Sequence, residues 1–118
     1  MAAIGIHHVQ ISVAPDLIDA SRRFYIDILG CTPIEDAFGK EGFWAAAGLQ
    51  EIHVRPETDI DRDRTRAHPA FLVTDLAAVE AKLKSGGCEI IPQPKLAGFE
   101  RFHTIDPSGN RLEIMQRV

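Results

Sequence analysis

The sequence matches itself once at an offset near sixty residues, and this internal repeat constrains the fold more than any other feature. The first half opens with the strand-like run 6–13, and the run 66–73 stands at the same place in the second half. A unit of about 55 residues buries too little apolar surface to be secure alone. We therefore expect the two units to share a core.

Each half continues with one short helix. Asp16 and Asp75 are the expected N-caps, and glycines at 30 and at 86–87 are the expected ends. Three further strands follow each helix, and a turn containing Pro and Gly at 106–110 separates the last two. The expected strands are 29–34, 42–47 and 50–55 in the first half and 86–91, 101–105 and 111–116 in the second.

The resulting order is β-α-β-β-β, twice, which predicts an α+β fold of two paired βαβββ modules. We expect four curved antiparallel strands in each module, with the helix outside and a central cleft between the paired inner faces. The chain is then one domain, 1–118. Module one covers about 4–57, the linker about 58–65 and module two about 66–118.

The charge balance argues against a nucleic-acid partner. Lys and Arg number 13 against 17 Asp and Glu, giving a net charge of −4, and the densest basic stretch, 62–66, is interrupted by Asp63. We expect a solvated linker there.

No apolar run approaches the roughly 20 residues that span a bilayer, and the N-terminus lacks the basic segment of a signal peptide. The sequence thus predicts a cytoplasmic protein with no membrane partner, with Cys31 and Cys88 as small buried hydrophobes.

Four side chains fall in register with the repeat. His8 shares one side of its strand with Gln10 and Ser12, and His68 opens the equivalent strand sixty positions later. His53 and Glu113 are also sixty apart, each forty-five residues beyond the histidine that opens its unit. If a pseudo-twofold axis relates the units, these four residues approach one another on the concave faces.

Neutral imidazoles and a carboxylate are ligands for Zn, Ni, Co, Mn or Fe(II). Such an ion holds neighbouring substrate oxygens and stabilises negative charge that develops on them. The sequence therefore predicts a divalent metal ion bound by His8, His53, His68 and Glu113. The alternative for each histidine is an ordinary hydrogen-bonded position at a strand end.

The motifs resemble those of one superfamily over nearly the whole chain. Their carriers are Ile6-His-His-Val, the F-Y-x-x-x-L-G of 24–30, and the D-P-x-G-N-x-x-E-I of 106–114. In this order and spacing the sequence is similar to the vicinal oxygen chelate superfamily, which contains glyoxalase I, bleomycin-resistance proteins, extradiol dioxygenases, methylmalonyl-CoA epimerase and fosfomycin-resistance enzymes. The resemblance implies that the paired modules form a half-open mixed β-barrel around a divalent metal.

Matched position by position, the resemblance implies ligand roles for His8, His68 and Glu113. His53 falls on the fourth ligand position, where glyoxalase I usually has Glu and the epimerases Gln. In glyoxalase-like catalysis a carboxylate bound at the metal also moves the substrate proton. The histidine at position 53 therefore leaves Glu113 as the obvious base among the four.

These observations favour a metal-dependent lyase or isomerase that moves a proton on a small oxygen-rich metabolite, with Glu113 and His53 as catalytic residues. One alternative is an extradiol-type dioxygenase, in which His8, His68 and Glu113 hold Fe(II) and His53 acts as acid or base. We rank it lower because the chain is short. A metal-free, bleomycin-resistance-like binding protein is the rival from another class, and a carrier with a vestigial ion is a third possibility.

Three further residues are candidates for substrate binding. Arg55 shares a strand face with His53 and can pair with a carboxylate or phosphate, or it is a plain surface charge. Trp44 is a candidate lining residue of an apolar pocket, although aromatic residues in small domains are usually core. His103 qualifies only if it faces the cleft, which the sequence leaves open. We expect a homodimer, with the site in one chain or shared between two.

Overall fold

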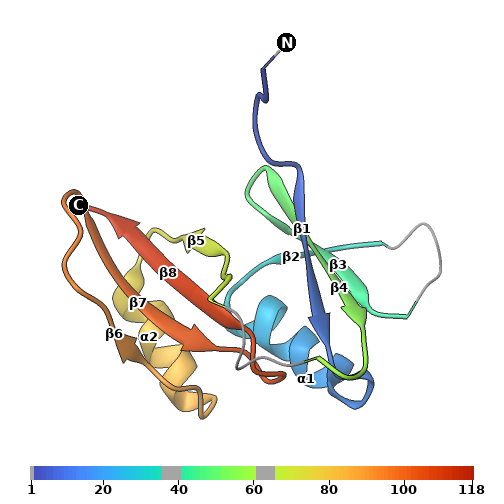
Figure 1. Ribbon diagram of the computed structural model, residues 1–118. Coiled ribbons are helices and arrows are strands. Elements are labelled where there is room, and N and C mark those ends of the chain that lie inside the picture. The colour runs from blue at the N-terminus through green and yellow to red at the C-terminus, as the bar shows by residue number, and fades with distance from the viewer. Residues whose placement is uncertain (1, 36–40, 61–65) are drawn as a thin grey trace. The chain divides into compact units, whose positions relative to one another are not determined.

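The computed structural model describes residues 2–35, 41–60 and 66–118. The chain divides into two compact units, Met1–Thr58 and Asp59–Val118, whose elements are labelled in Figure 1. Residues 62–65 of the expected solvated stretch lie outside the described residues. In the described ranges, no helix has both the length and the apolar character needed to cross a membrane.

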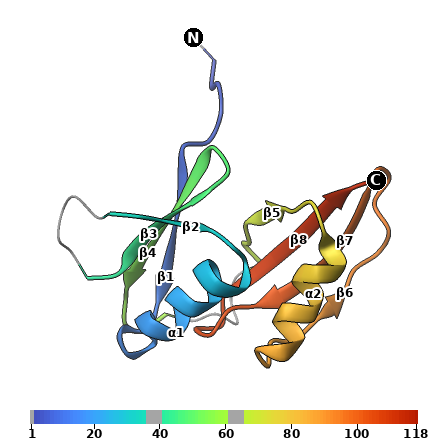
Figure 2. The same cartoon turned by 180° about the vertical axis from the view of Figure 1, so that it is seen from behind.

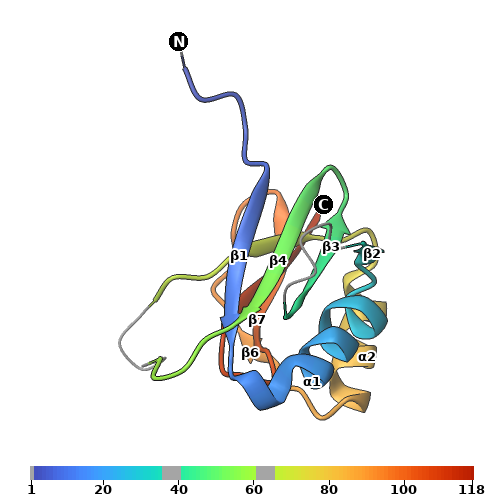
Figure 3. The ribbon, with the colours of Figure 1, turned by 90° about the vertical axis from the view of Figure 1, so that its right-hand side faces the viewer.

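The first unit contains one helical segment and a four-stranded sheet with the order β1-β4-β3-β2. Figure 3 shows β1, β4 and β3 side by side. The elements are β1 (His8–Val13), η1 (Pro15–Leu17), α1 (Ile18–Arg22), η2 (Arg23–Ile28), β2 (Thr32–Ile34), β3 (Phe43–Ala47) and β4 (Gln50–Pro56).

The second unit repeats this plan with the sheet order β5-β8-β7-β6. Its helix covers one face of the sheet, as Figure 2 shows from behind. The elements are β5 (Ala70–Leu72), α2 (Leu76–Ser85), β6 (Ile91–Pro92), β7 (Phe99–Ile105) and β8 (Arg111–Arg117). The predicted β-α-β-β-β order is thus confirmed in both units, and the fold is α+β.

The expectation of four antiparallel strands in each module is wrong for one pairing, whereas the mixed sheet that the resemblance implied is confirmed. In each unit the first strand runs parallel to the last, β1 with β4 and β5 with β8. The helical crossover returns the chain so that the second strand runs in the same direction as the first. Two antiparallel steps then reverse the direction twice, so the fourth strand ends parallel to the first.

The first helix also begins differently from the prediction, since the Asp16 side chain does not cap it. Pro15 opens a 3-10 turn one residue earlier, and the Leu17 N–H donates to the carbonyl of Ala14 at 2.9 Å. Asp16 therefore lies inside the first turn. In the second unit the predicted cap is confirmed, because the Ala78 N–H donates to the Asp75 carboxylate at 3.0 Å.

Strand alternation gives each sheet one apolar and one polar face. The buried apolar residues of β1 and β4 are Ile11, Val13, Ile52 and Val54, and those of β7 and β8 are Phe102, Leu112 and Ile114. The opposite face of each sheet carries the histidines and charged residues described next. The polar face predicted for the first strand, with His8, Gln10 and Ser12, is present.

Candidate metal centre

The polar face of the second unit collects charged and imidazole side chains from β7 and β8. His103 pairs with Glu113 across the two strands, and Arg111 lies two residues before Glu113 on the same face. Both His103 and Glu113 are buried, with 7% and 6% of their surface exposed. His103 therefore faces the same side as Glu113, which settles the parity that the sequence left open.

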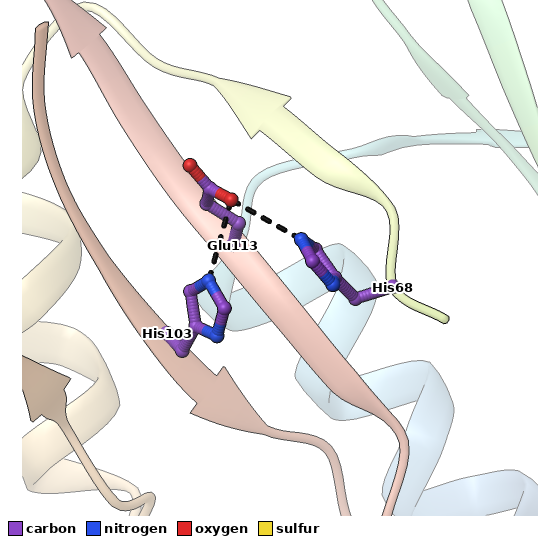
Figure 4. A group of neighbouring side chains, drawn as sticks. All are labelled: His68, His103 and Glu113. Carbon is purple, nitrogen blue, oxygen red and sulfur yellow. Dashed lines mark hydrogen bonds and ion pairs between the residues drawn. The ribbon is translucent and has the colours of Figure 1, made fainter. Parts of the chain in front are cut away.

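Two histidines approach one oxygen of Glu113. Nε2 of His68 lies 3.2 Å from Oε1, and Nε2 of His103 lies 3.3 Å from the same atom. Figure 4 shows the two rings pointing at this carboxylate, one from β7 and one from the segment before β5. Within the described part of the chain, these three residues form the one group of His, Cys, Asp and Glu side chains that could hold a metal ion, with ligand atoms within 4.8 Å of one another.

The backbone fixes the tautomer of His68. Its Nδ1 lies 3.0 Å from the carbonyl oxygen of Arg66, which only accepts hydrogen bonds, so Nδ1 carries a proton. In the neutral ring Nε2 then presents a lone pair toward Oε1 of Glu113, which is itself an acceptor. Two acceptors at this distance are joined either by a proton or by a metal ion. A donor bond from the remote nitrogen to a carbonyl is typical of histidines that bind metals.

The two oxygens of Glu113 have different neighbours. Nη1 of Arg101 donates to Oε2 at 3.2 Å, and the same guanidinium donates to the carbonyl of Pro94 at 3.2 and 3.0 Å. Burial acts to raise the pKa of Glu113, but the hydrogen bonds from Arg101 and His103 outweigh it and hold the pKa below its ordinary value. Burial is also the main reason that the pKa of His103 lies below its ordinary value. The site therefore keeps an ionised carboxylate beside a neutral imidazole at neutral pH.

The polar face of the first unit is a stack of three rings. The ring of His53 is parallel to that of Trp44, with centroids 4.1 Å apart and an angle of 10°. It is also stacked on His8, at 4.1 Å and 16°. His53 is thus held on both faces and is 8% exposed. Within each unit the two predicted ligands are in contact, His8 with His53 in the first and His68 with Glu113 in the second.

A carboxylate that the sequence did not single out engages His53. Nε2 of His53 lies 2.9 Å from Oε1 of Glu51, which is two residues earlier on the same face of β4. The hydrogen bond from His53 is the main reason that the pKa of Glu51 lies below its ordinary value. Because Nε2 donates to this carboxylate, the neutral ring of His53 keeps its lone pair on Nδ1.

The other candidates are placed as follows. Arg55 lies on β4 two residues beyond His53, on the same face and opposite Ser12. Cys31 is buried and Cys88 half-buried, and neither is in a disulfide. Burial raises the pKa of the Cys31 thiol to about 11, which makes it a poor nucleophile.

Comparison with known proteins identifies the family. A sequence model of the Glyoxalase/Bleomycin resistance protein/Dioxygenase superfamily matches residues 5–114. The chain belongs to this superfamily. No curated protein matches it in sequence.

Several solved structures share the fold. A protein from Bacillus anthracis assigned to the glyoxalase family is 31% identical, with a TM-score of 0.88 over 100% of this chain and 98% of that one. A lactoylglutathione lyase from Agrobacterium tumefaciens is 18% identical, with a TM-score of 0.72 over 98% and 96%. A fosfomycin resistance protein from Listeria monocytogenes is 18% identical, with a TM-score of 0.76 over 100% and 94%. At these lower identities the last two show likeness of fold alone.

Proposed function

We propose that the protein is a metal-dependent enzyme of glyoxalase type that moves a proton on a small oxygen-rich metabolite. In this proposal a divalent ion is held through Nε2 of His68 and Oε1 of Glu113, and the sequence pattern adds His8 and His53 as the remaining ligands. The main support is the juxtaposition of two acceptors, the lone pair of His68 and the carboxylate oxygen of Glu113, 3.2 Å apart.

The donor set fits such an ion. One imidazole with its remote N–H on a carbonyl, beside an ionised carboxylate held by an arginine, is a typical half of a site for Zn, Ni, Co, Mn or Fe(II). When bound, the ion would act as a Lewis acid for negative charge that develops on substrate oxygens.

The contacts divide the acid-base work between the two predicted catalytic residues. Glu113 has its Oε2 held by Arg101 and its pKa lowered, so it is the weaker base and the better anionic ligand. His53 is oriented by Glu51 at Nε2, as carboxylates orient the imidazole of catalytic pairs. The neutral ring of His53 has one lone pair, on Nδ1, so His53 serves either as the fourth ligand or as the base. As the base, Nδ1 of His53 accepts the substrate proton, and the Glu51 carboxylate stabilises the imidazolium that forms.

Three residues remain candidates for holding the substrate. Trp44 and Arg55 share the face of His53, and His103 lies beside Glu113. An arginine there suits an anionic group of the substrate, such as a carboxylate. The proposed substrate is therefore a small anion or polar metabolite with two neighbouring oxygens.

Metal analysis of the purified protein, followed by titration of the apoprotein with Zn, Ni, Co and Mn, tests the metal site. We expect near-stoichiometric metal in the wild type and its loss in His68→Ala and Glu113→Gln. Glu100→Gln is the matched control, since Glu100 is an exposed glutamate of β7. No metal binding by the wild type, or equal binding by all variants, would contradict the proposal and favour a metal-free binding protein.

A screen of hemithioacetals of 2-oxoaldehydes, acyl-CoA epimers and catechols tests the reaction. Turnover of either of the first two classes supports proton transfer, whereas ring cleavage of a catechol with Fe(II) supports the dioxygenase alternative. Loss of turnover in His53→Gln with metal content retained would assign His53 to the chemistry. Light scattering of the same preparations tests the expected homodimer.

A further inference from the structure

The three side chains around Oε1 of Glu113 are not equivalent, because their other contacts differ. His103 has a second neighbour that the sequence did not single out. Nη1 of Arg111 lies 3.1 Å from Nδ1 of His103, on the side of the ring away from Glu113. The ring of His103 therefore lies between a guanidinium and a carboxylate.

This arrangement determines where the proton of His103 is. A guanidinium has only donors, so Nδ1 of His103 must accept from Arg111. The proton of the neutral ring is then on Nε2, which lies 3.3 Å from Oε1 of Glu113. In the series of hydrogen bonds from Arg111 through His103 to Glu113, each donor therefore faces an acceptor.

His68 has the opposite tautomer. Its Nδ1 donates to the carbonyl of Arg66, which leaves the lone pair on Nε2. Of the two imidazoles beside Glu113, therefore, only that of His68 presents a lone pair toward the shared centre. Nε2 of His103 carries the proton and has no lone pair to offer.

We infer that Arg111 is a positioning residue: it fixes His103 in the Nε2–H tautomer, so that His103 orients the carboxylate of Glu113 and does not bind the ion. The tautomer follows from the contacts alone, and only the statement about the ion rests on the proposed function. The second unit then supplies two ligands, His68 and Glu113, although three side chains lie close enough.

The inference also defines how Glu113 binds. Oε2 is occupied by Arg101, whose side chain is 20% exposed, and one lone pair of Oε1 accepts from His103. A carboxylate oxygen has a second lone pair. Each oxygen of Glu113 therefore keeps one lone pair, and only Oε1 lies beside Nε2 of His68, so we place the ion on Oε1.

NMR of the metal-free protein with 15N-labelled histidine tests the tautomers directly. At mildly alkaline pH, where histidine is neutral, long-range couplings identify which nitrogen carries the proton. We expect Nε2–H for His103 and Nδ1–H for His68, with the His103 signals assigned by their absence in His103→Gln. Arg111→Met, which removes the donor, should give His103 a mixture of tautomers, and Arg111→Lys should restore Nε2–H.

Nδ1–H for His103 in the wild type, or an unchanged tautomer in Arg111→Met, would overturn the inference. This result does not depend on metal binding, so it stands even if the proposed function fails. If Arg111→Met does not fold, the wild-type spectrum and Arg111→Lys decide the question. Arg117→Met, at the exposed end of β8, is the matched control.

Zn²⁺ affinity tests the second half of the inference in proteins shown to fold by circular dichroism. Loss of a residue that orients a ligand costs about 10- to 100-fold in metal affinity, so Arg111→Met should fall in this range. His103→Gln keeps an N–H that can donate to Glu113 and should bind within a few-fold of the wild type, whereas His68→Gln should lose binding. Equal losses in His103→Gln and His68→Gln would make His103 a ligand and refute the inference.

Discussion

Asp106 holds the turn that joins β7 to β8, and its replacement tests how the site is kept in register. Asp106 is 3% exposed, and both of its carboxylate oxygens accept hydrogen bonds. Oδ1 accepts from the backbone N–H groups of Ser108 at 2.9 Å and Asn110 at 2.8 Å, and Oδ2 accepts from the Asn110 amide at 2.8 Å. Because this turn sets the pairing of His103 with Glu113, its loss should loosen both strands at the candidate metal centre.

The hydrogen bonds give the expected size of the effect. A hydrogen bond to a charged group contributes about 1.5–3 kcal/mol, but donors in a half-buried turn regain water when the carboxylate is removed. We therefore expect Asp106→Ala to lower the free energy of unfolding by about 3 kcal/mol. Asp106→Asn keeps an oxygen for the two backbone donors and loses only the bond from the Asn110 amide, so it should cost about 1 kcal/mol.

Urea unfolding of the metal-free protein, followed by circular dichroism, measures both values from the midpoint at constant slope. Glu100→Gln, at an exposed position near the start of β7, should stay within about 0.5 kcal/mol of the wild type. The reasoning would be refuted if Asp106→Ala also stayed within that margin. Equal losses in Asp106→Ala and Asp106→Asn would show that the two backbone bonds contribute little.

Three further predictions concern the backbone, the helix cap and pH. Gly42→Ala places a Cβ against the carbonyl oxygen of Val54, whereas the Cβ of Gly48→Ala meets open space, and both glycines have positive φ. Gly42→Ala should therefore lower the free energy of unfolding by more than Gly48→Ala. Comparable losses in urea unfolding would contradict this. Asp75→Ala removes the cap of α2 and should cost about 1 kcal/mol, and an unchanged midpoint would show that the cap is dispensable. The folded-state pKa of Glu113 lies below the ordinary value of a glutamate, so its stabilising contribution is complete above that ordinary value and lost as the pH falls through the folded value. Glu113→Gln should therefore flatten the acid side of the stability profile of the apoprotein, and an unaltered slope would argue against it.

The sequence predicted the order of the helices and strands because local residues mark where each of them begins and ends. Asp75 caps its helix as expected, and the glycine and proline of the 106–110 turn separate two strands. Asp16 failed as a cap because Pro15, immediately before it, can itself begin a helical turn. The parallel pairing of first and last strands was missed because it depends on the path of the whole unit and not on any local pattern.

The candidate site was partly accessible from sequence. Within each unit the two residues predicted as ligands lie together, His8 with His53 and His68 with Glu113, whereas the meeting of all four stays a prediction. Arg101 and Arg111 were missed, although each lies two residues from His103 or Glu113 and so shares a strand face. Charged residues alternate on many exposed strands, and only the cross-strand register shows which of them meet.

The structure was also needed to find Glu51. It lies two residues before His53, a spacing that places both on one face of β4. Which ring nitrogen it engages, and hence which one keeps the lone pair, follows only from side-chain contacts. Proton positions on histidine are the part of the site that no pattern of residues could supply.

The parallel pairing of first and last strands has a consequence for folding. His68 and Glu113 are 45 residues apart, and they meet only when β5 docks on β8 to close the sheet of the second unit. Closing such a loop lowers the entropy of the chain before the stabilising contact is made. Contacts between residues so far apart in sequence therefore form late and by cooperative folding. A ligand held by both residues would therefore stabilise the unit against global unfolding, and hydrogen exchange would show it as slower exchange of the most protected amides of β8 rather than of the surface turns.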